Sequence, residues 1–260
     1  MTNAAPSTNP PANVTWEISD WLDDAPLPTF VVRDTRSAQG RLDERVKTVT
    51  VADLVLAHGH ACDGLLRGVW ALRSLFDVAF GDEPIDRSDL LVVSKNSPCL
   101  GDVAAYLTGG RARFGTHRLD NSLGVGFQVQ RLSTGDAWEV REEPDFFPAD
   151  IVAWEDALLR DDLSPTDKGQ ILPVHEAAQW NWVRDVLIPS APSDHYHARS
   201  LADLQLPSPL YEARRTDTVN RLVPAPVETK NLEAPSSAHE PLDDTDRDAW
   251  RSRYEAGPNA

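Results

Sequence analysis

Residues 61–80 read ACDGLLRGVWALRSLFDVAF, and this stretch decides the fold. Its large apolar residues recur at spacings of three and four: Leu65, Val69, Leu72 and Phe76. This periodicity predicts an amphipathic helix with one face turned toward a core. The helix also carries Gly64 and Gly68, one turn apart, and each glycine costs about 1 kcal/mol of helix stability against alanine. Their presence indicates that another backbone or a ligand approaches the helix closely there.

The sequence that follows this helix predicts strands as well as helices. Residues 89–93 form a short apolar strand, and Pro98 suits the first turn of a helix over 98–108 that Gly109-Gly110 ends. Strand-like runs come next, at 112–114, 125–132 and 137–141, and helical segments after them, at about 149–162 and 167–187. The turn at 133–136 predicts a hairpin between the last two strands. We therefore predict an α+β fold, with a mixed or antiparallel sheet packed against helices.

Composition separates both ends of the chain from this pattern. Residues 1–14 are small, polar and proline-containing, which predicts a flexible leader. Residues 216–260 form a Pro-rich acidic tail that we expect to be largely extended or disordered. One docked helical turn at Trp250–Tyr254 is the alternative there. The predicted folded domain is 15–215.

The charge balance limits the kinds of partner. The chain has 260 residues with 25 Lys and Arg against 41 Asp and Glu, a formal net charge of −16. Such a surface disfavours nucleic acid, whose binding needs cations, and anionic membranes as well. Two cysteines cannot make a disulfide scaffold, so we expect a cytoplasmic protein with free thiols.

Metal-ligand side chains gather in residues 57–64, AHGHACDG. His58, His60 and Cys62 offer imidazole and thiolate, which are donors suited to zinc, iron or copper. On a regular helix His58 and Cys62 would share a face. If the helix begins only near residue 61, both histidines lie in an entry loop. Cys99 starts the next predicted helix, so one histidine with both cysteines could surround a metal ion. The alternative is that these residues only pack or face solvent.

The string HGHACDG at 58–64, followed by a glycine-containing helix, resembles the FmdE family, whose signature is H-G-H-x-C-P-G. The segment Asn96-Ser97-Pro98-Cys99-Leu100-Gly101-Asp102-Val103 resembles the family's second conserved region. Residues 107–110 and 113–115 are similar to its helix stop and its Phe-Gly turn. The proline of the signature is Asp63 here, and the C-terminal zinc ribbon of longer members is absent. The family takes its name from a component of formylmethanofuran dehydrogenase.

The resemblance implies a small metal-binding α+β protein that forms a homodimer. The metal ligands it implies are His58, His60, Cys62 and Cys99. We expect zinc, with iron or haem as alternatives, and a small-molecule ligand. If the protein is an enzyme, Asp102 or His117 would move the proton. The alternative function is a non-catalytic metallochaperone or a carrier of haem or another cofactor.

Overall fold

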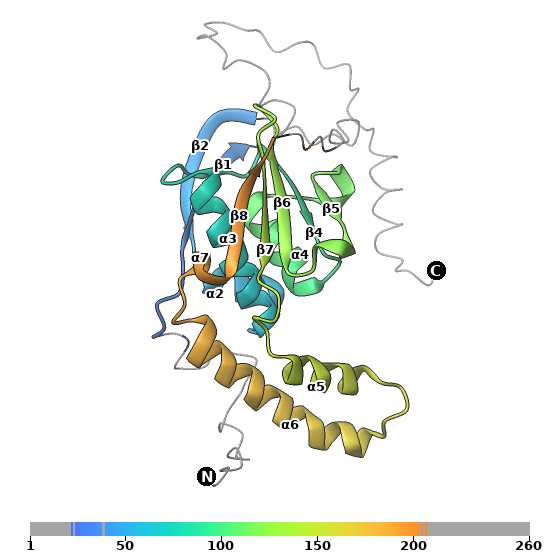
Figure 1. Ribbon diagram of the computed structural model, residues 1–260. Coiled ribbons are helices and arrows are strands. Elements are labelled where there is room, and N and C mark those ends of the chain that lie inside the picture. The colour runs from blue at the N-terminus through green and yellow to red at the C-terminus, as the bar shows by residue number, and fades with distance from the viewer. Residues whose placement is uncertain (1–21, 23, 38–39, 203, 205, 207–260) are drawn as a thin grey trace, which may run out of the picture. The chain divides into compact units, whose positions relative to one another are not determined.

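The computed structural model describes residues 22, 24–37, 40–202, 204 and 206 (Figure 1). The leader at 1–14 and the tail at 216–260 lie outside these residues, as does the turn considered at Trp250–Tyr254. The structure therefore does not test the flexible ends or the boundaries at 15 and 215.

The larger of two sheets has five strands in the order β5-β4-β6-β7-β8. They are β4 (Leu90–Ser94), β5 (His117–Leu119), β6 (Gly126–Arg131), β7 (Ala137–Glu142) and β8 (Tyr196–Leu201). Strands β4 and β5 run parallel, and the other neighbours run antiparallel. The mixed sheet and the hairpin between β6 and β7 confirm the predicted α+β class.

A second sheet of three strands has the order β2-β1-β3. It consists of β1 (Phe30–Ser37), β2 (Gly40–Val49) and β3 (Ile85–Asp86), with β1 and β2 antiparallel and β3 parallel to β1. Phe30 and Val32 of β1 are buried, and the Phe30 ring meets Phe76 edge-on with centroids 6.0 Å apart. The small sheet therefore shares one core with the helix predicted within 61–80.

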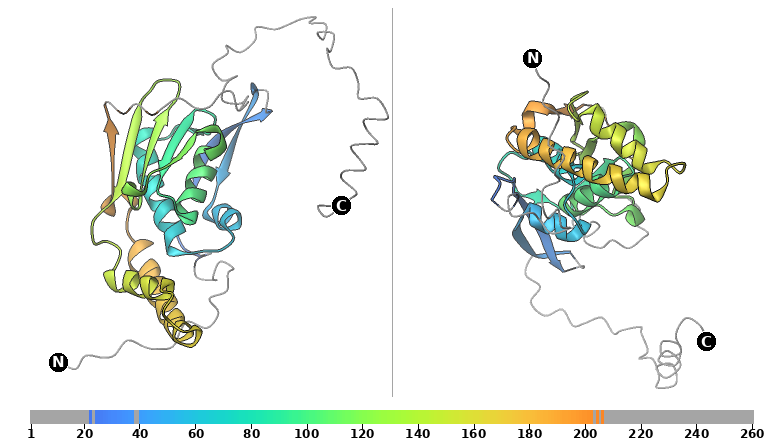
Figure 2. Two further views of the ribbon diagram at one scale, coloured as in Figure 1. Left: turned by 90° about the vertical axis from the view of Figure 1, so that its right-hand side faces the viewer. Right: turned by 90° about the horizontal axis from the view of Figure 1, so that it is seen from below.

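That helix, α3 (Asp63–Ala79), lies between the two sheets beside α4 (Pro98–Thr108), as the left view of Figure 2 shows. Residues all around α3 are buried, including Leu65, Leu66, Val69, Leu72 and Leu75. Contacts on both sides explain this burial, because a helix covered by sheets on two faces has little surface left for water. Both helices are confirmed, but α3 is buried on more than the one face that its sequence predicted.

The two glycines of α3 mark where α4 approaches. A Cβ atom on Gly64 would lie 3.1 Å from Cys99 Sγ, and one on Gly68 would lie 3.1 Å from Leu100 Cδ2. A close approach is present at both glycines, but the approaching groups are side chains, among them two from the first turn of α4, and not a backbone or a ligand as predicted. This packing brings the two cysteines of the chain together.

A helical hairpin joins β7 to β8 and projects beyond the sheet (Figure 1). It consists of α5 (Ala149–Leu159) and α6 (Pro165–Trp182), followed by the π-helical turn η3 (Val183–Leu187) and the short helix α7 (Pro192–His195). Both helices of the hairpin were predicted. None of the helices in the described part of the chain combines the length and the hydropathy needed to cross a membrane.

The strand predicted at 112–114 is wrong. These residues form a single 3-10 turn, η1 (Ala112–Phe114), which ends at Gly115 in the left-handed conformation with φ 70°. The Gly115 N–H donates to Ala112 O, so the backbone closes on itself and cannot pair with a neighbouring strand. Strand β5 begins only at His117, and a second 3-10 turn, η2 (Asn121–Leu123), follows it.

Candidate metal centre

Three helix ends meet at the candidate site. Helix α2 (Val51–His58) begins at the N-cap Thr50, whose hydroxyl accepts from the Asp53 N–H while Asp53 accepts from the Thr50 N–H. It ends at His58 because Gly59 takes the left-handed conformation, with φ 101°. The chain then turns, and α3 begins at Asp63. His58 is therefore the last residue of α2, and Cys62 is the N-cap of α3. The two residues do not share a face of one helix, as the first alternative predicted. His60 lies in the loop between the helices, but His58 does not, so the second alternative is also wrong.

Each cysteine stands at the N-terminus of a helix. Cys62 is the N-cap of α3, and its Sγ accepts from the Leu65 N–H at 3.3 Å. Cys99 is the second residue of α4, directly after Pro98. Unpaired N–H groups and the helix dipole give both positions a positive potential, which favours the thiolate over the thiol.

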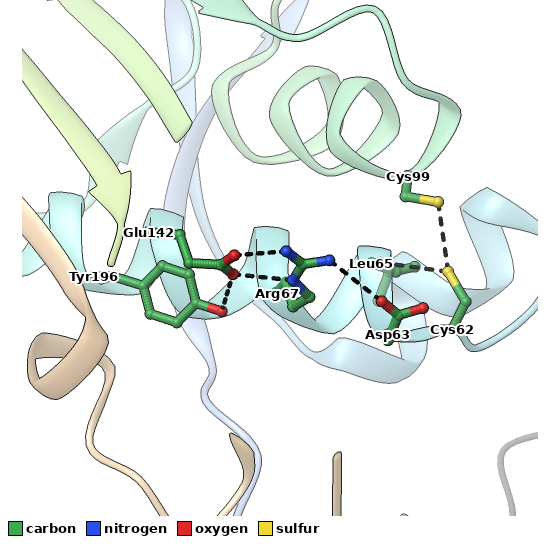
Figure 3. A network of polar contacts seen from close by, with 7 residues as sticks. All are labelled: Cys62, Asp63, Leu65, Arg67, Cys99, Glu142 and Tyr196. Carbon is green, nitrogen blue, oxygen red and sulfur yellow. Dashed lines mark hydrogen bonds and ion pairs between the residues drawn. The ribbon is translucent and has the colours of Figure 1, made fainter. Parts of the chain in front are cut away.

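The structure brings together His58, Cys62 and Cys99. The two Sγ atoms lie 3.5 Å apart, and His58 Nε2 lies 3.8 Å from Cys62 Sγ (Figure 3 shows the two cysteines). One ligand atom from each of the three residues falls within 4.8 Å of the others. Within the described part of the chain, His58, Cys62 and Cys99 therefore form a group of candidate ligands that lie close enough together to share one metal ion.

The thiols do not titrate alike. Cys62 donates a hydrogen bond to Cys99, which is the largest cause that lowers the pKa of Cys99 to about 6, and nearby His58 also favours the thiolate. The same hydrogen bond raises the pKa of Cys62, and burial adds to the rise. Of the two sulfur atoms, Cys62 therefore keeps its proton more firmly, and Cys99 more readily becomes the thiolate.

His58 is oriented by Asp102 from α4. Its Nδ1 lies 2.7 Å from Asp102 Oδ2, and its side chain is only 4% exposed. A carboxylate oxygen accepts hydrogen bonds, so Nδ1 carries a proton, and Nε2 faces Cys62. Metal-binding histidines are commonly held in this way.

His60 lies outside the three-residue group. It is exposed, and its ring centroid is 4.5 Å from that of His58. Gly59 turns the chain between the two histidines, so they do not face one point from the same helix. Of the four ligands implied by the resemblance, the structure gathers three.

His117 stands at the start of β5, near Gly101 of α4. Its Nε2 lies 2.8 Å from Ser94 Oγ, and the residue is buried. Burial lowers the pKa of His117, and the nearby charge of Asp102 partly opposes this shift. The ring therefore favours its neutral form in the folded protein.

The lowered pKa of His117 predicts a pH dependence of stability. Unfolding frees the imidazole to take up a proton near pH 6.5, whereas the folded state binds it only at lower pH. Wild type should therefore lose stability as the pH falls below about 6.5, and more steeply than His117→Asn. Urea unfolding of both proteins between pH 5 and 8 measures this difference, and parallel curves would contradict it.

A partly buried ionic network, which the sequence patterns did not predict, adjoins the cysteines (Figure 3). Arg67 donates to both carboxylate oxygens of Glu142, at 2.9 and 2.5 Å, and its charge lies 3.5 Å from Asp63. The Tyr196 hydroxyl donates to Glu142 at 3.0 Å. Burial raises the pKa of Asp63, although Arg67 opposes the shift. Only the spacing of Asp63 and Arg67 by four residues signalled part of this network.

Comparison with known proteins agrees with the resemblance seen in the sequence. Residues 57–163 match the family model described as FmdE, molybdenum formylmethanofuran dehydrogenase operon. Over this segment the chain is similar to the FmdE family. The segment contains all the predicted site residues: His58, His60, Cys62, Cys99, Asp102 and His117.

One solved structure that resembles this chain is a tungsten formylmethanofuran dehydrogenase FmdE-like protein from Syntrophus aciditrophicus. The two are 15% identical, with a TM-score of 0.37, and the match covers 60% of this chain and 74% of that one. No curated protein matches the chain.

Proposed function

We propose that this FmdE-like protein binds one zinc ion through His58 Nε2, Cys62 Sγ and Cys99 Sγ. The observation that carries the proposal is the gathering of these three donors within 4.8 Å of one another from three helix ends. Three protein ligands leave a coordination position for a small molecule, which is the arrangement of catalytic zinc sites.

The distances between the donors suit tetrahedral zinc. Bond lengths of about 2.3 Å to sulfur and 2.0–2.1 Å to nitrogen place two sulfur ligands about 3.8 Å apart, and sulfur and nitrogen about 3.5 Å apart. The corresponding distances here are 3.5 Å between the Sγ atoms and 3.8 Å between Cys62 Sγ and His58 Nε2. Small side-chain rotations would reconcile the two sets.

The donor set favours a single ion over haem. Haem iron takes one or two axial ligands along a line, whereas these three donors surround a point. Iron(II) could use the same donors as zinc, so the identity of the metal needs direct analysis. A reducing compartment such as the cytoplasm would keep both thiols available for the ion.

A bound zinc ion would act as a Lewis acid on the small molecule beside it. The residues of this chain would prepare that site. Asp102 would hold the ring of His58 in the metal-binding tautomer, and exposed His60 would face the incoming ligand. His117, which is hydrogen-bonded to Ser94, lies close enough to Asp102 to feel its charge and would provide a site that can hold a proton.

Elemental analysis tests this proposal. Purified wild-type protein should carry about one metal ion per chain, and Cys62→Ser and Cys99→Ser should both lose it. A metal-free wild type after metal-supplemented growth, or an unchanged metal content in either variant, would overturn the shared site.

Asp102→Asn should weaken the binding of zinc by about 10- to 100-fold. The substitution removes the charge that holds the proton on His58 Nδ1, while it leaves all three ligands in place. Competition with a chromophoric chelator measures the affinity. Asp77→Asn is the matched control, since Asp77 is exposed and pairs with Arg73 on α3, and it should bind zinc like wild type. Equal affinities for all three proteins would show that Asp102 does not orient the ligand.

A non-catalytic metallochaperone is the second candidate. The partial exposure of Cys62 and Cys99 supports it, because an acceptor protein could then reach the ligands. The rate of zinc transfer to excess chelator separates the two functions. Release within seconds favours a carrier, and retention over hours favours a resident cofactor.

We also propose a homodimer, in which the α5–α6 hairpin contacts the second copy. Both helices expose large apolar side chains: Val152, Trp154, Leu159, Leu172 and Val174. Trp is enriched at protein–protein interfaces. Light scattering should give twice the chain mass for wild type and a smaller mass for Trp154→Glu, and a monomeric wild type would contradict the proposal.

A further inference from the structure

We propose that Cys62 and Cys99 form a reversible disulfide within one chain when a peroxide oxidises them, and that this state and the metal-bound state exclude each other. The pairing of the two sulfur atoms stands on geometry alone. Only the claim that the disulfide and a bound metal ion exclude each other rests on the proposed zinc site.

The two sulfur atoms are already in contact. Their separation is 3.5 Å, and a disulfide bond needs about 2.05 Å. Rotation about the Cα–Cβ bonds with a small shift of either helix end closes this gap. A hydrogen bond from one thiol to the other also places the sulfur atoms face to face with no other group between them.

The backbone holds both cysteines in place. Cys62 and Gly64 share the first turn of α3, and a Cβ atom on Gly64 would lie 3.2 Å from Cys99 Cβ. The first turns of α3 and α4 are thus pressed together where the sulfur atoms meet. Because the residues are 37 apart in sequence, this contact depends on the packing of the two helices and would be lost on unfolding.

Oxidants can reach the pair. Both cysteines are partly exposed, and the exposed His60 lies in the turn just before Cys62. They are also the only two cysteines of the chain, so a disulfide within one chain can have only this pairing.

The reaction balances with hydrogen peroxide. One thiolate attacks a peroxide oxygen and, with uptake of one proton, becomes a sulfenic acid as water leaves. The second sulfur, as its thiolate, then attacks the sulfenic sulfur and forms the S–S bond, and the displaced hydroxide takes up a proton and leaves as a second water. Two thiols and one peroxide thereby give one disulfide and two waters, with two electrons passing to the peroxide. In the zinc form the two Cys ligands are consumed, two protons are taken up, and the ion keeps only His58.

The test begins with wild-type protein freed of metal by chelation and treated with an equimolar amount of hydrogen peroxide. Mass spectrometry under denaturing, non-reducing conditions should show loss of the mass of two hydrogen atoms, and both titratable thiols should disappear. Dithiothreitol should restore them. Cys62→Ser and Cys99→Ser should instead gain oxygen or link between chains. A wild type that only gains oxygen, or only links between chains, would overturn the pairing.

The second arm uses protein loaded with zinc. One ion should be released for each disulfide formed, as followed with a chromophoric chelator. A disulfide that forms while zinc stays bound would overturn the exclusion. If the protein binds no metal, the first arm still decides the pairing, and if zinc binds but no disulfide forms, only this inference fails.

Discussion

Cys99→Ser and Cys62→Ser are each expected to weaken zinc binding by about 100- to 1000-fold. Closed zinc sites bind with about 10–16 kcal/mol, or roughly 2.5–4 kcal/mol for each of four ligands. The loss of one ligand's share of the binding free energy corresponds to the expected increase in Kd. Competition titration with a calibrated chelator measures it.

His60→Ala is the matched control for this titration. His60 lies beside the site but outside the group of three donors, so its replacement should change the affinity by less than the loss of either cysteine. A loss as large as that of the cysteine variants would make His60 a ligand and would require the turn at Gly59 to rearrange around the ion.

Arg67→Met is expected to lower the free energy of unfolding by about 3–5 kcal/mol. The substitution leaves the charge of Glu142 buried without its partner, and such single removals are strongly destabilising. Arg67 and Glu142 are 13% and 10% exposed, and the guanidinium also lies 3.8 Å from the centroid of the Phe147 ring. Urea denaturation gives the loss.

Arg73→Met controls for the loss of an arginine from the same helix. Arg73 pairs with Asp77 at the surface, so its removal should cost less than about 1 kcal/mol. The double variant Arg67→Met/Glu142→Leu should be more stable than Arg67→Met, since it removes both charges. Equal losses for Arg67→Met and Arg73→Met would show that the network is not buried in solution.

Local patterns were sufficient to predict the central elements of the fold. Apolar residues at helical spacing predicted α3, and Pro98 with Gly109-Gly110 predicted both ends of α4. The small sheet escaped prediction because charged residues interrupt the apolar pattern of β2. The pairing of β1 with β3 in that sheet also joins residues more than fifty positions apart.

The candidate site was predictable in its residue types but not in its arrangement. The clustering of His58, His60 and Cys62 is visible in the sequence, yet only the left-handed Gly59 determines which histidine faces the cysteines. The partner of Arg67 was hidden for another reason. Glu142 is 75 residues away, on a strand whose sequence does not indicate which helix it will cover.

X-ray absorption at the metal edge of the purified protein tests the central claim most directly. The account predicts two sulfur neighbours at about 2.3 Å and lighter neighbours, including one imidazole, at about 2.0–2.1 Å. A shell of nitrogen and oxygen without sulfur would contradict it, because the ion would then lie away from Cys62 and Cys99.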